Sequence, residues 1–208
     1  METRDDEYKT LLSESSGIYK SKGSKFLSFA YPVGDEDAAK EIIGNLRKEY
    51  HDARHYCYAY LFGESKDNCR TNDDGEPSGT AGRPIFGQIQ SKDITNVLIV
   101  VVRYFGGTLL GTGGLVTAYK SAARDALENG TIITKTIDQT VSVDFEYEDM
   151  NLVMRILSDD SVRILKQEFE VRCNIHFKVR KSRIKSIAEK LNLLKTVSCK
   201  PLETKKNY

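Results

Sequence analysis

The residue types best suited to chemistry gather in three short segments, and the most polar of these is Asp73-Asp-Gly-Glu-Pro-Ser-Gly-Thr-Ala-Gly-Arg83. Its carboxylates Asp74 and Glu76 could bind a cation or act as acid and base, but in a glycine-rich loop such residues more often form turns and caps. Ser78 lacks the surroundings of a nucleophilic serine, because the motif reads G-E-P-S-G instead of G-x-S-x-G and no base is adjacent. We therefore expect a binding loop and no catalytic residue here.

A second segment, Arg103-Tyr-Phe-Gly-Gly-Thr-Leu-Leu-Gly-Thr-Gly-Gly114, leads from a predicted buried strand into a predicted helix. Its glycines let the backbone approach a ligand closely, and a helix N-terminus directs free amides at an anion. The segment lacks the lysine of a Walker motif, and Val116 stands where a dinucleotide fingerprint needs glycine. Two interpretations stay open: an anion site, and tight packing of the glycines against a neighbouring strand.

The third segment, His51-Asp-Ala-Arg-His55, is similar to the H-E-x-x-H motif of zinc hydrolases. That motif works on a helix, where positions i and i+4 share a face, whereas the residues from Ala53 onward alternate as in a strand. His176 is the only other histidine and lies in a different predicted domain. We therefore expect no metal and no cofactor, with His55 facing the core.

Length and composition predict where such a chain resides. Its 208 residues exceed the usual single domain of ~100 to 150, which favours one medium and one small domain. The four cysteines form no C-x-x-C pair and are expected as reduced thiols. The acidic start of the chain lacks a signal-peptide pattern, and its longest aliphatic run, Val97–Val102, is far shorter than the ~20 residues of a membrane span. We expect a cytoplasmic protein with no membrane partner.

Hydrophobic periodicity predicts the elements that position the three segments. Alternation around Gly23 predicts a hairpin over 17–31, and helical spacing after a possible N-cap at Asp35 predicts a helix over 36–50. Period-two alternation predicts a strand over 53–62. The remaining elements of this part are predicted as a loop over 63–83, a short helix over 84–90, a buried strand over 97–105, a helix over 113–128 and a strand or strand-like connection over 131–136.

A second pattern begins after Asp138. It predicts strands over 140–147, 162–170, 172–179 and near Val197, with helices over 150–157 and 182–194. This order is the ferredoxin-like β-α-β-β-α-β motif. The predicted fold class is α+β, with an N-terminal domain over 1–137 and a ferredoxin-like C-terminal domain over 138–208.

Charge is distributed unevenly along the chain. Residues 171–208 hold 11 Lys and Arg against 2 Asp and Glu, although the whole chain carries only +1. Cations at the start of the last helix oppose its macrodipole, which phosphate contact would explain. The domain lacks the signature of a base-stacking RNA module, so such contact would be with the RNA backbone. The alternative is a solvated helix face. The candidate nucleic-acid-binding residues are Arg172, Lys178, Arg180, Lys181, Arg183 and Lys185.

The three polar segments, His51-Asp-Ala-Arg-His-Tyr-Cys57, 74–84 and 103–115, together resemble the YigZ/IMPACT family in type and order. The resemblance implies that the larger domain is an α/β sandwich like the second domain of a small-subunit ribosomal protein and the fourth domain of elongation factor G. The C-terminal part is similar to the small domain of bacterial members, which resembles the C-terminal domain of the same factor.

The resemblance also implies a function. Eukaryotic members bind the ribosome-associated activator of a translation-initiation kinase, but the two-domain layout matches the bacterial form, so kinase control does not transfer directly. We expect a translation-associated binding protein that engages the ribosome, RNA or a translation factor. The alternatives are a pure protein-interaction adaptor and an enzyme that acts on a phosphorylated small molecule, or a hydrolase or dipeptidase, through the glycine-rich segment. The family-like positions expected to form a binding surface are Arg54, Asp74, Glu76, Arg83, Arg103, Tyr104, Gly106, Gly107 and Gly114.

Overall fold

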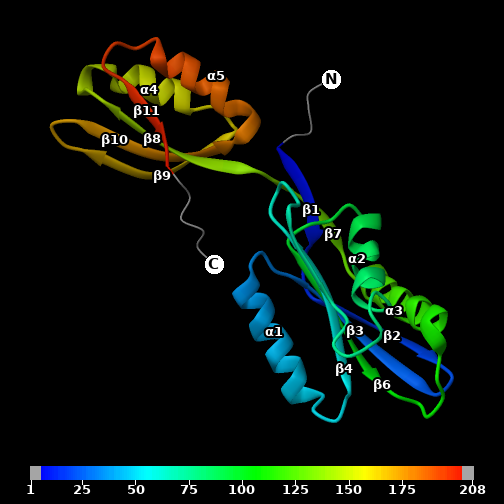
Figure 1. The fold of residues 1–208 in the computed structure, drawn as a ribbon. Coiled ribbons are helices and arrows are strands. Elements are labelled where there is room, and N and C mark those ends of the chain that lie inside the picture. Colours follow the sequence, from blue (N-terminus) through cyan, green and yellow to red (C-terminus); the bar gives the residue numbers. More distant parts are fainter. Residues whose placement is uncertain (1–5, 203–208) are drawn as a thin grey trace. The chain divides into compact units, whose positions relative to one another are not determined.

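The computed structural model describes residues 6–202, and their contacts divide them into two compact units (Figure 1). The N-terminal unit comprises Tyr8–Lys135. The C-terminal unit comprises residues from Thr136 onward together with Asp6 and Glu7, which lie far away in the sequence. No helix among residues 6–202 is long and apolar enough to cross a membrane.

A five-stranded antiparallel sheet forms the centre of the N-terminal unit. Its strands follow the order β2-β3-β6-β4-β5. Central β6 carries the apolar run Val97–Val102, whose residues are buried on both faces as the unbroken hydrophobic pattern predicts. The strands are β2 (Ser15–Ser21), β3 (Ser24–Pro32), β4 (His55–Phe62), β5 (Asn68–Asn72) and β6 (Val97–Tyr104).

Helices cover both faces of this sheet (Figure 1). α1 (Glu36–Glu49) covers one face, and the Asp35 carboxylate caps it by accepting hydrogen bonds from two backbone amides at 2.9 and 2.8 Å. α2 (Gly82–Ser91) and α3 (Gly111–Glu128) pack on the other face. Alternate residues of β4 enter the two cores, with Tyr56, Tyr60 and Phe62 toward α1 and Cys57, Ala59 and Leu61 toward α2 and α3.

The structure corrects the sequence prediction at two strands. Residues predicted as one long loop over 63–83 contain β5, an exposed polar strand that pairs with β4 at the edge of the sheet. β1 (Glu7–Leu11), which was not predicted, pairs with β7 (Ile132–Thr136) in a separate two-stranded sheet. Neither missed strand shows regular burial alternation, because β5 is exposed along almost its whole length and the two buried residues of β1 are consecutive.

The C-terminal unit has the predicted β-α-β-β-α-β order. Its four strands form an antiparallel sheet with the order β11-β8-β10-β9, and α4 and α5 pack on one face (Figure 1). The chain enters α4 through the short 3₁₀ helix η1 (Tyr147–Asp149). The other elements are β8 (Asp138–Phe145), α4 (Met150–Leu157), β9 (Val162–Phe169), β10 (Cys173–Arg180), α5 (Lys181–Asn192) and β11 (Ser198–Pro201).

Candidate functional site

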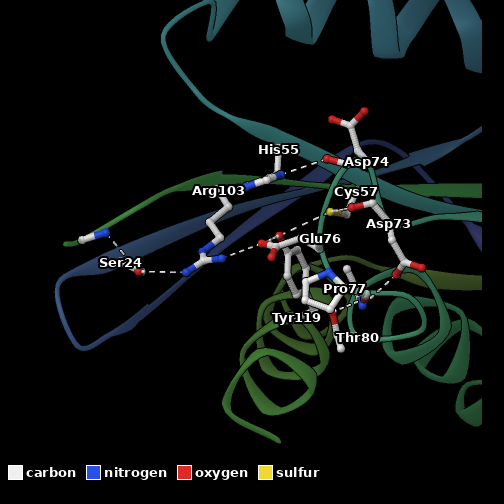
Figure 2. A network of polar contacts seen from close by, with 12 residues as sticks. Ser24, His55, Cys57, Asp73, Asp74, Glu76, Pro77, Thr80, Arg103 and Tyr119 are labelled. Atoms are coloured by element: carbon white, nitrogen blue, oxygen red, sulfur yellow. Dashed lines mark hydrogen bonds and ion pairs between the residues drawn. The ribbon is translucent and has the colours of Figure 1, made fainter. Parts of the chain in front are cut away.

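A buried ion pair connects two of the three polar segments (Figure 2). Glu76 lies in the loop after β5, Arg103 lies on β6, and their side chains are only 4% and 6% exposed. Arg103 Nη1 donates to Glu76 Oε1 at 2.6 Å, and the hydroxyl of Tyr119 on α3 donates to the same oxygen at 2.7 Å. Since a buried charge needs partners, these bonds fix the loop to both the sheet and the helix.

Cys57 extends this network from β4. Its Sγ lies 3.3 Å from the Tyr119 hydroxyl oxygen and 3.0 Å from the backbone carbonyl oxygen of Asp73. Burial raises the pKa of the Cys57 thiol and, together with the neighbouring Cys57 and Glu76, that of the Tyr119 hydroxyl. Both groups are therefore protonated at neutral pH and act as hydrogen-bond donors. A thiol in this state is a poor nucleophile.

The guanidinium of Arg103 also reaches the hairpin between β2 and β3. Its Nη2 lies 3.4 Å from Ser24 Oγ, which accepts the backbone N–H of Gly106 at 3.1 Å. The guanidinium carbon lies 5.3 and 5.6 Å from the ring centroids of Phe26 and Phe105. Its Nε has no hydrogen-bond partner among residues 6–202. Arg103 therefore connects the polar loop with the start of the glycine-rich segment.

Asp73 organises the other end of the loop. Its Oδ1 accepts the backbone N–H groups of Ala81 and Gly82 at 2.9 and 2.8 Å, and its Oδ2 accepts that of Gly79 at 2.8 Å. These bonds cap the N-terminus of α2, at which Ala81 has no side-chain cap of its own. Burial acts to raise the pKa of the Asp73 carboxyl, but the backbone hydrogen bonds outweigh burial and lower it. Sequence reasoning missed this role because no local capping motif places the cap so many residues before the helix.

Asp74 connects the loop to α1 and β4. Its Oδ1 lies 2.6 Å from Arg47 Nη2, and its Oδ2 accepts the backbone N–H of Tyr56 at 2.7 Å. The Nδ1 atom of His55 lies 2.9 Å from the Asp74 carbonyl oxygen. His55 therefore contacts the loop backbone. We expected it to face the core, but its ring is only half-buried. His55 is the first residue of strand β4, so it does not share a helix with His51. Residues 6–202 contain no group of three or more side chains that could hold a metal ion.

The glycine-rich segment supports the packing interpretation at one position. A Cβ atom on Gly106 would lie 2.0 Å from the carbonyl carbon of Gly23, so only glycine allows this contact between backbones. Gly107 and Gly111 have positive φ angles of 81° and 72°. Gly113 has neither constraint, because a Cβ there would meet nothing within 4 Å and its φ is not positive. The uncapped start of α3 does not identify a ligand by itself, so the anion site stays a prediction.

The nine positions expected to form a binding surface do not all lie at the surface. Glu76 and Arg103 are interior and pair with each other. Tyr104 is half-buried and donates to Asp52 Oδ1 at 2.8 Å; this bond, followed by burial, raises the pKa of Tyr104 to about 12. Asp74 and Gly114 are also half-buried, while the exposed positions are Arg54, Arg83, Gly106 and Gly107.

The six candidate cations of the C-terminal unit are all exposed but lie on different elements. Lys178 and Arg180 lie on β10, Arg172 lies just before it, and Lys181, Arg183 and Lys185 lie on α5. Three of them have acidic partners: Lys178 with Asp138 at 3.4 Å, Arg180 with Glu7 at 3.6 Å and Arg183 with Asp159 at 3.3 Å. They therefore belong to two different surfaces of the unit.

Comparison with known proteins assigns the family. The model of the Impact N-terminal domain matches residues 22–127, which hold all three polar segments. The chain belongs to the IMPACT family. IMPACT family member YigZ of Escherichia coli is 34% identical over 74% of this chain and 76% of that protein. An IMPACT family member of Haemophilus influenzae is also 34% identical, over 80% of this chain and 82% of that protein.

A solved structure extends the likeness to both units. It is described as the crystal structure of a hypothetical protein, and it covers 96% of this chain and 99% of its own. The TM-score is 0.71 at 27% sequence identity. The likeness to this solved structure therefore includes the C-terminal unit, which lies outside the matched domain model.

Proposed function

We propose that this protein is a translation-associated binding protein that engages the ribosome, RNA or a translation factor. The observation that carries the proposal is that the buried polar residues of the family motifs bind one another and the backbone, and so hold the loop in place. Glu76, Arg103 and Tyr119 satisfy one another in the interior, and Asp73 caps a helix. Bonds of this kind build a rigid surface, whereas a catalytic site needs an accessible nucleophile or base.

The exposed part of the loop is the part available to a partner. Ser78 and Arg83 are exposed, while the residues on either side of the turn are fixed by Asp73 and Glu76. Preorganisation of this kind lowers the entropy lost when a partner binds. Arg54 is exposed on the chain just before β4, and its backbone N–H donates to the carbonyl oxygen of Arg103 at 3.4 Å. The exposed Arg54 and Arg83 therefore both lie on segments that the buried network holds in place.

Cosedimentation of tagged protein with purified ribosomes tests the proposal. We expect the wild type to pellet with ribosomes at about 50 mM salt and to be released progressively toward about 200 mM. Arg54→Ala combined with Arg83→Ala should weaken pelleting, whereas Arg124→Ala, an exposed arginine of α3 paired with Glu128, should not. Absence of the wild type from the pellet at every salt concentration would reject a stable ribosome complex, and pull-down of a single soluble partner would favour the adaptor alternative.

An enzyme that acts on a phosphorylated small molecule is the second candidate. It is favoured by the uncapped start of α3 at Gly111 and by the open space beside Gly113. This candidate requires that a phosphorylated compound protects the glycine-rich segment from hydrogen exchange without ribosomes. Unchanged exchange in that segment at millimolar inorganic phosphate would count against it.

A further inference from the structure

The sheet of the C-terminal unit has one face covered by helices and one face that no helix or strand of this unit within residues 6–202 covers (Figure 1). On β10, Ile175, Phe177 and Val179 point toward α4 and α5 and are buried. The alternate residues of β10 therefore point to the opposite face. Among them are Lys178 and Arg180, which are both exposed. We call this opposite side the open sheet face.

Strand register brings basic residues from three strands together on this face. Residues that are directly opposite in an antiparallel pair project their side chains to the same side. His176 is opposite Lys166 on β9 and Ser142 on β8, and Ser142 is in turn opposite Lys200 on β11. Lys178 is opposite Arg163 on β9. The basic residues of the open sheet face are Arg163, Lys166, His176, Lys178, Arg180 and Lys200.

The acids on this face neutralise only part of that charge. Its carboxylates are Asp138, Asp144 and Glu168, of which Asp138 pairs with Lys178 at 3.4 Å and Glu168 pairs with Lys166. Glu7 of the same unit also pairs with Arg180 at 3.6 Å. These pairs are exposed, and exposed pairs contribute only about 0 to 1 kcal/mol, so a phosphate can compete for the cation. Within residues 6–202, neither Arg163 nor Lys200 forms an ion pair.

The uncharged residues of the face contribute less to phosphate binding. Thr140 offers a hydroxyl donor, but Ser142 is buried and the Asn174 amide already donates to Ser142 Oγ at 2.9 Å and to Asp144 Oδ1 at 2.7 Å. Neighbouring strands are about 4.8 Å apart and rows along a regular strand about 6.6 to 6.8 Å apart. A register shift between His176 and Phe177 separates Lys166 from Arg163 on β9, and the cations still lie at spacings that a chain of phosphates can follow. No Phe, Tyr or Trp of the described residues lies in these rows, and the half-buried imidazole of His176 is the one aromatic ring that they contain, so the face has no row of rings on which successive bases could stack.

We propose that the open sheet face binds the phosphate backbone of RNA with little regard to base sequence, and that this face, rather than the cations of α5, supplies the main contacts. The inference rests on the proposed function and identifies the partner as RNA. The cations of α5, including Lys185 and Lys190, lie on a helix that packs on the other face of the sheet. One RNA segment lying across the open sheet face would leave these α5 residues without contact.

The test compares two triple variants of the full chain that remove equal charge. The sheet variant carries Arg163→Gln, Lys166→Gln and Lys200→Gln, and the helix variant carries Lys181→Gln, Lys185→Gln and Lys190→Gln; all six residues are exposed. Fluorescence anisotropy with two unrelated single-stranded RNAs, between about 50 and 200 mM salt, gives the log-log slope of affinity against salt. Three lost contacts should make the slope of the sheet variant shallower by about 2, and should reduce affinity roughly 10- to 100-fold for both RNAs.

The helix variant is expected to keep the wild-type slope to within about 0.5, which is less than one phosphate contact. A shallower slope in the helix variant only, or equal changes in both variants, would overturn the inference. So would wild-type protein that binds neither RNA at low salt; if that protein still pelleted with ribosomes, the proposed function would stand and this inference alone would fail. Should the sheet variant unfold early, the double variant Arg163→Gln and Lys200→Gln replaces it, with an expected slope change of about 1.4.

Discussion

At the residue scale, the stability of the N-terminal unit depends most on how the charge of Glu76 is compensated. Glu76→Gln should lower the free energy of unfolding by about 3 to 5 kcal/mol, because the Arg103 guanidinium would stay buried without its counter-charge. Urea denaturation followed by circular dichroism measures this change. The matched control is Glu128→Gln on α3, whose carboxylate pairs with Arg124 at 3.8 Å in solvent and should matter by less than about 1 kcal/mol. Equal effects of the two substitutions would contradict the role assigned to the pair.

The cysteines offer a second test at single residues. Burial raises the pKa of the Cys57 thiol, and the residue has no exposed surface, whereas Cys69 on β5 is exposed. We expect native protein at about pH 8 to react with iodoacetamide at Cys69 first and at Cys57 only after unfolding. Mass spectrometry of the labelled peptides resolves the two sites, and denatured protein labelled at all four cysteines is the control. Rapid labelling of Cys57 in folded protein would show that the network around Tyr119 opens readily.

How far the site could be predicted from the sequence differs from residue to residue. The composition of 73–83 and 103–114 marked both segments as candidates, and the family resemblance that they carry is confirmed. The pairing of Glu76 with Arg103 was out of reach, because it joins residues 27 apart across an intervening helix. Tyr119 was missed for a related reason: an apolar helix face holds many aromatic residues, and only the fold shows which of them meets a carboxylate.

At the element scale, α2 depends on a cap that is distant in sequence, and this gives a prediction with a pH dependence. Asp73→Asn should lower the free energy of unfolding at pH 7 by about 1 to 2 kcal/mol, since Asp73 accepts hydrogen bonds from three backbone N–H groups. The folded-state pKa of the Asp73 carboxyl lies below its unfolded value. Its stabilisation is therefore fully present above the unfolded pKa of about 3.9 and is lost as pH falls through the folded pKa.

The pH dependence of the Asp73→Asn effect shows whether the charge of the carboxylate or only the shape of the side chain stabilises the cap of α2. The difference between wild type and Asp73→Asn in urea midpoint should shrink as the pH falls below about 4. Asp160→Asn, an exposed residue of the C-terminal unit, is the control and should show no such trend in the N-terminal unit. A difference that stayed constant from neutral to acid pH would mean that the carboxylate charge is not what stabilises the cap.

The glycines at the two ends of the glycine-rich segment should respond in opposite ways to the same substitution. Gly106→Ala should lower stability by more than about 1 kcal/mol, because its Cβ would overlap the backbone of Gly23 at 2.0 Å. Gly113→Ala should be neutral or raise stability by up to about 1 kcal/mol, because the position is helical and open. Thermal unfolding of the two variants and the wild type measures these changes in stability. Similar losses at both positions would indicate that the structure around Gly113 is tighter than the contacts imply.

Elements could be predicted wherever a periodic apolar face determines them. α1, with its cap at Asp35, β6 and α4 lie within one or two residues of the predicted ranges. β5 was assigned to a loop because Asn68-Cys-Arg-Thr-Asn72 has no apolar residue except one cysteine, and it is a strand only because the edge of β4 offers hydrogen-bond partners. Tertiary pairing thus overrode local propensity at the edges of the sheet.

At the scale of the whole molecule, periodicity predicted a second pattern from residue 138 but could not show which other residues complete the C-terminal unit. The second pattern begins near β8, which starts at Asp138. Asp6 and Glu7 nevertheless belong to the same unit, although about two thirds of the chain separates them from it in sequence. No periodic signal can connect such distant segments, since the connection consists of individual hydrogen bonds.

Those bonds lead to a prediction about how the two units respond to a single substitution. The Asp6 side chain is 6% exposed, its carboxylate accepts the hydroxyl of Ser182 near the start of α5, and its carbonyl oxygen accepts the Ile137 N–H at 2.6 Å. A carboxylate at a helix N-terminus is also favoured by the helix dipole. Asp6→Ala should therefore destabilise the C-terminal unit by about 1 to 2 kcal/mol and leave the N-terminal unit unchanged, if the two units unfold independently.

The two buried cysteines report on the two units separately in the same sample, because Cys173 lies in the core of the C-terminal unit and Cys57 in that of the N-terminal unit. Thiol labelling along a urea gradient should give a lower midpoint at Cys173 in Asp6→Ala than in wild type, with the midpoint at Cys57 unchanged. Asp160→Ala, an exposed position of the C-terminal unit, should move neither midpoint appreciably. Equal shifts at both cysteines would show that the units unfold as one cooperative body, and the absence of a shift at Cys173 would show that the start of the chain contributes little to the unit that it joins.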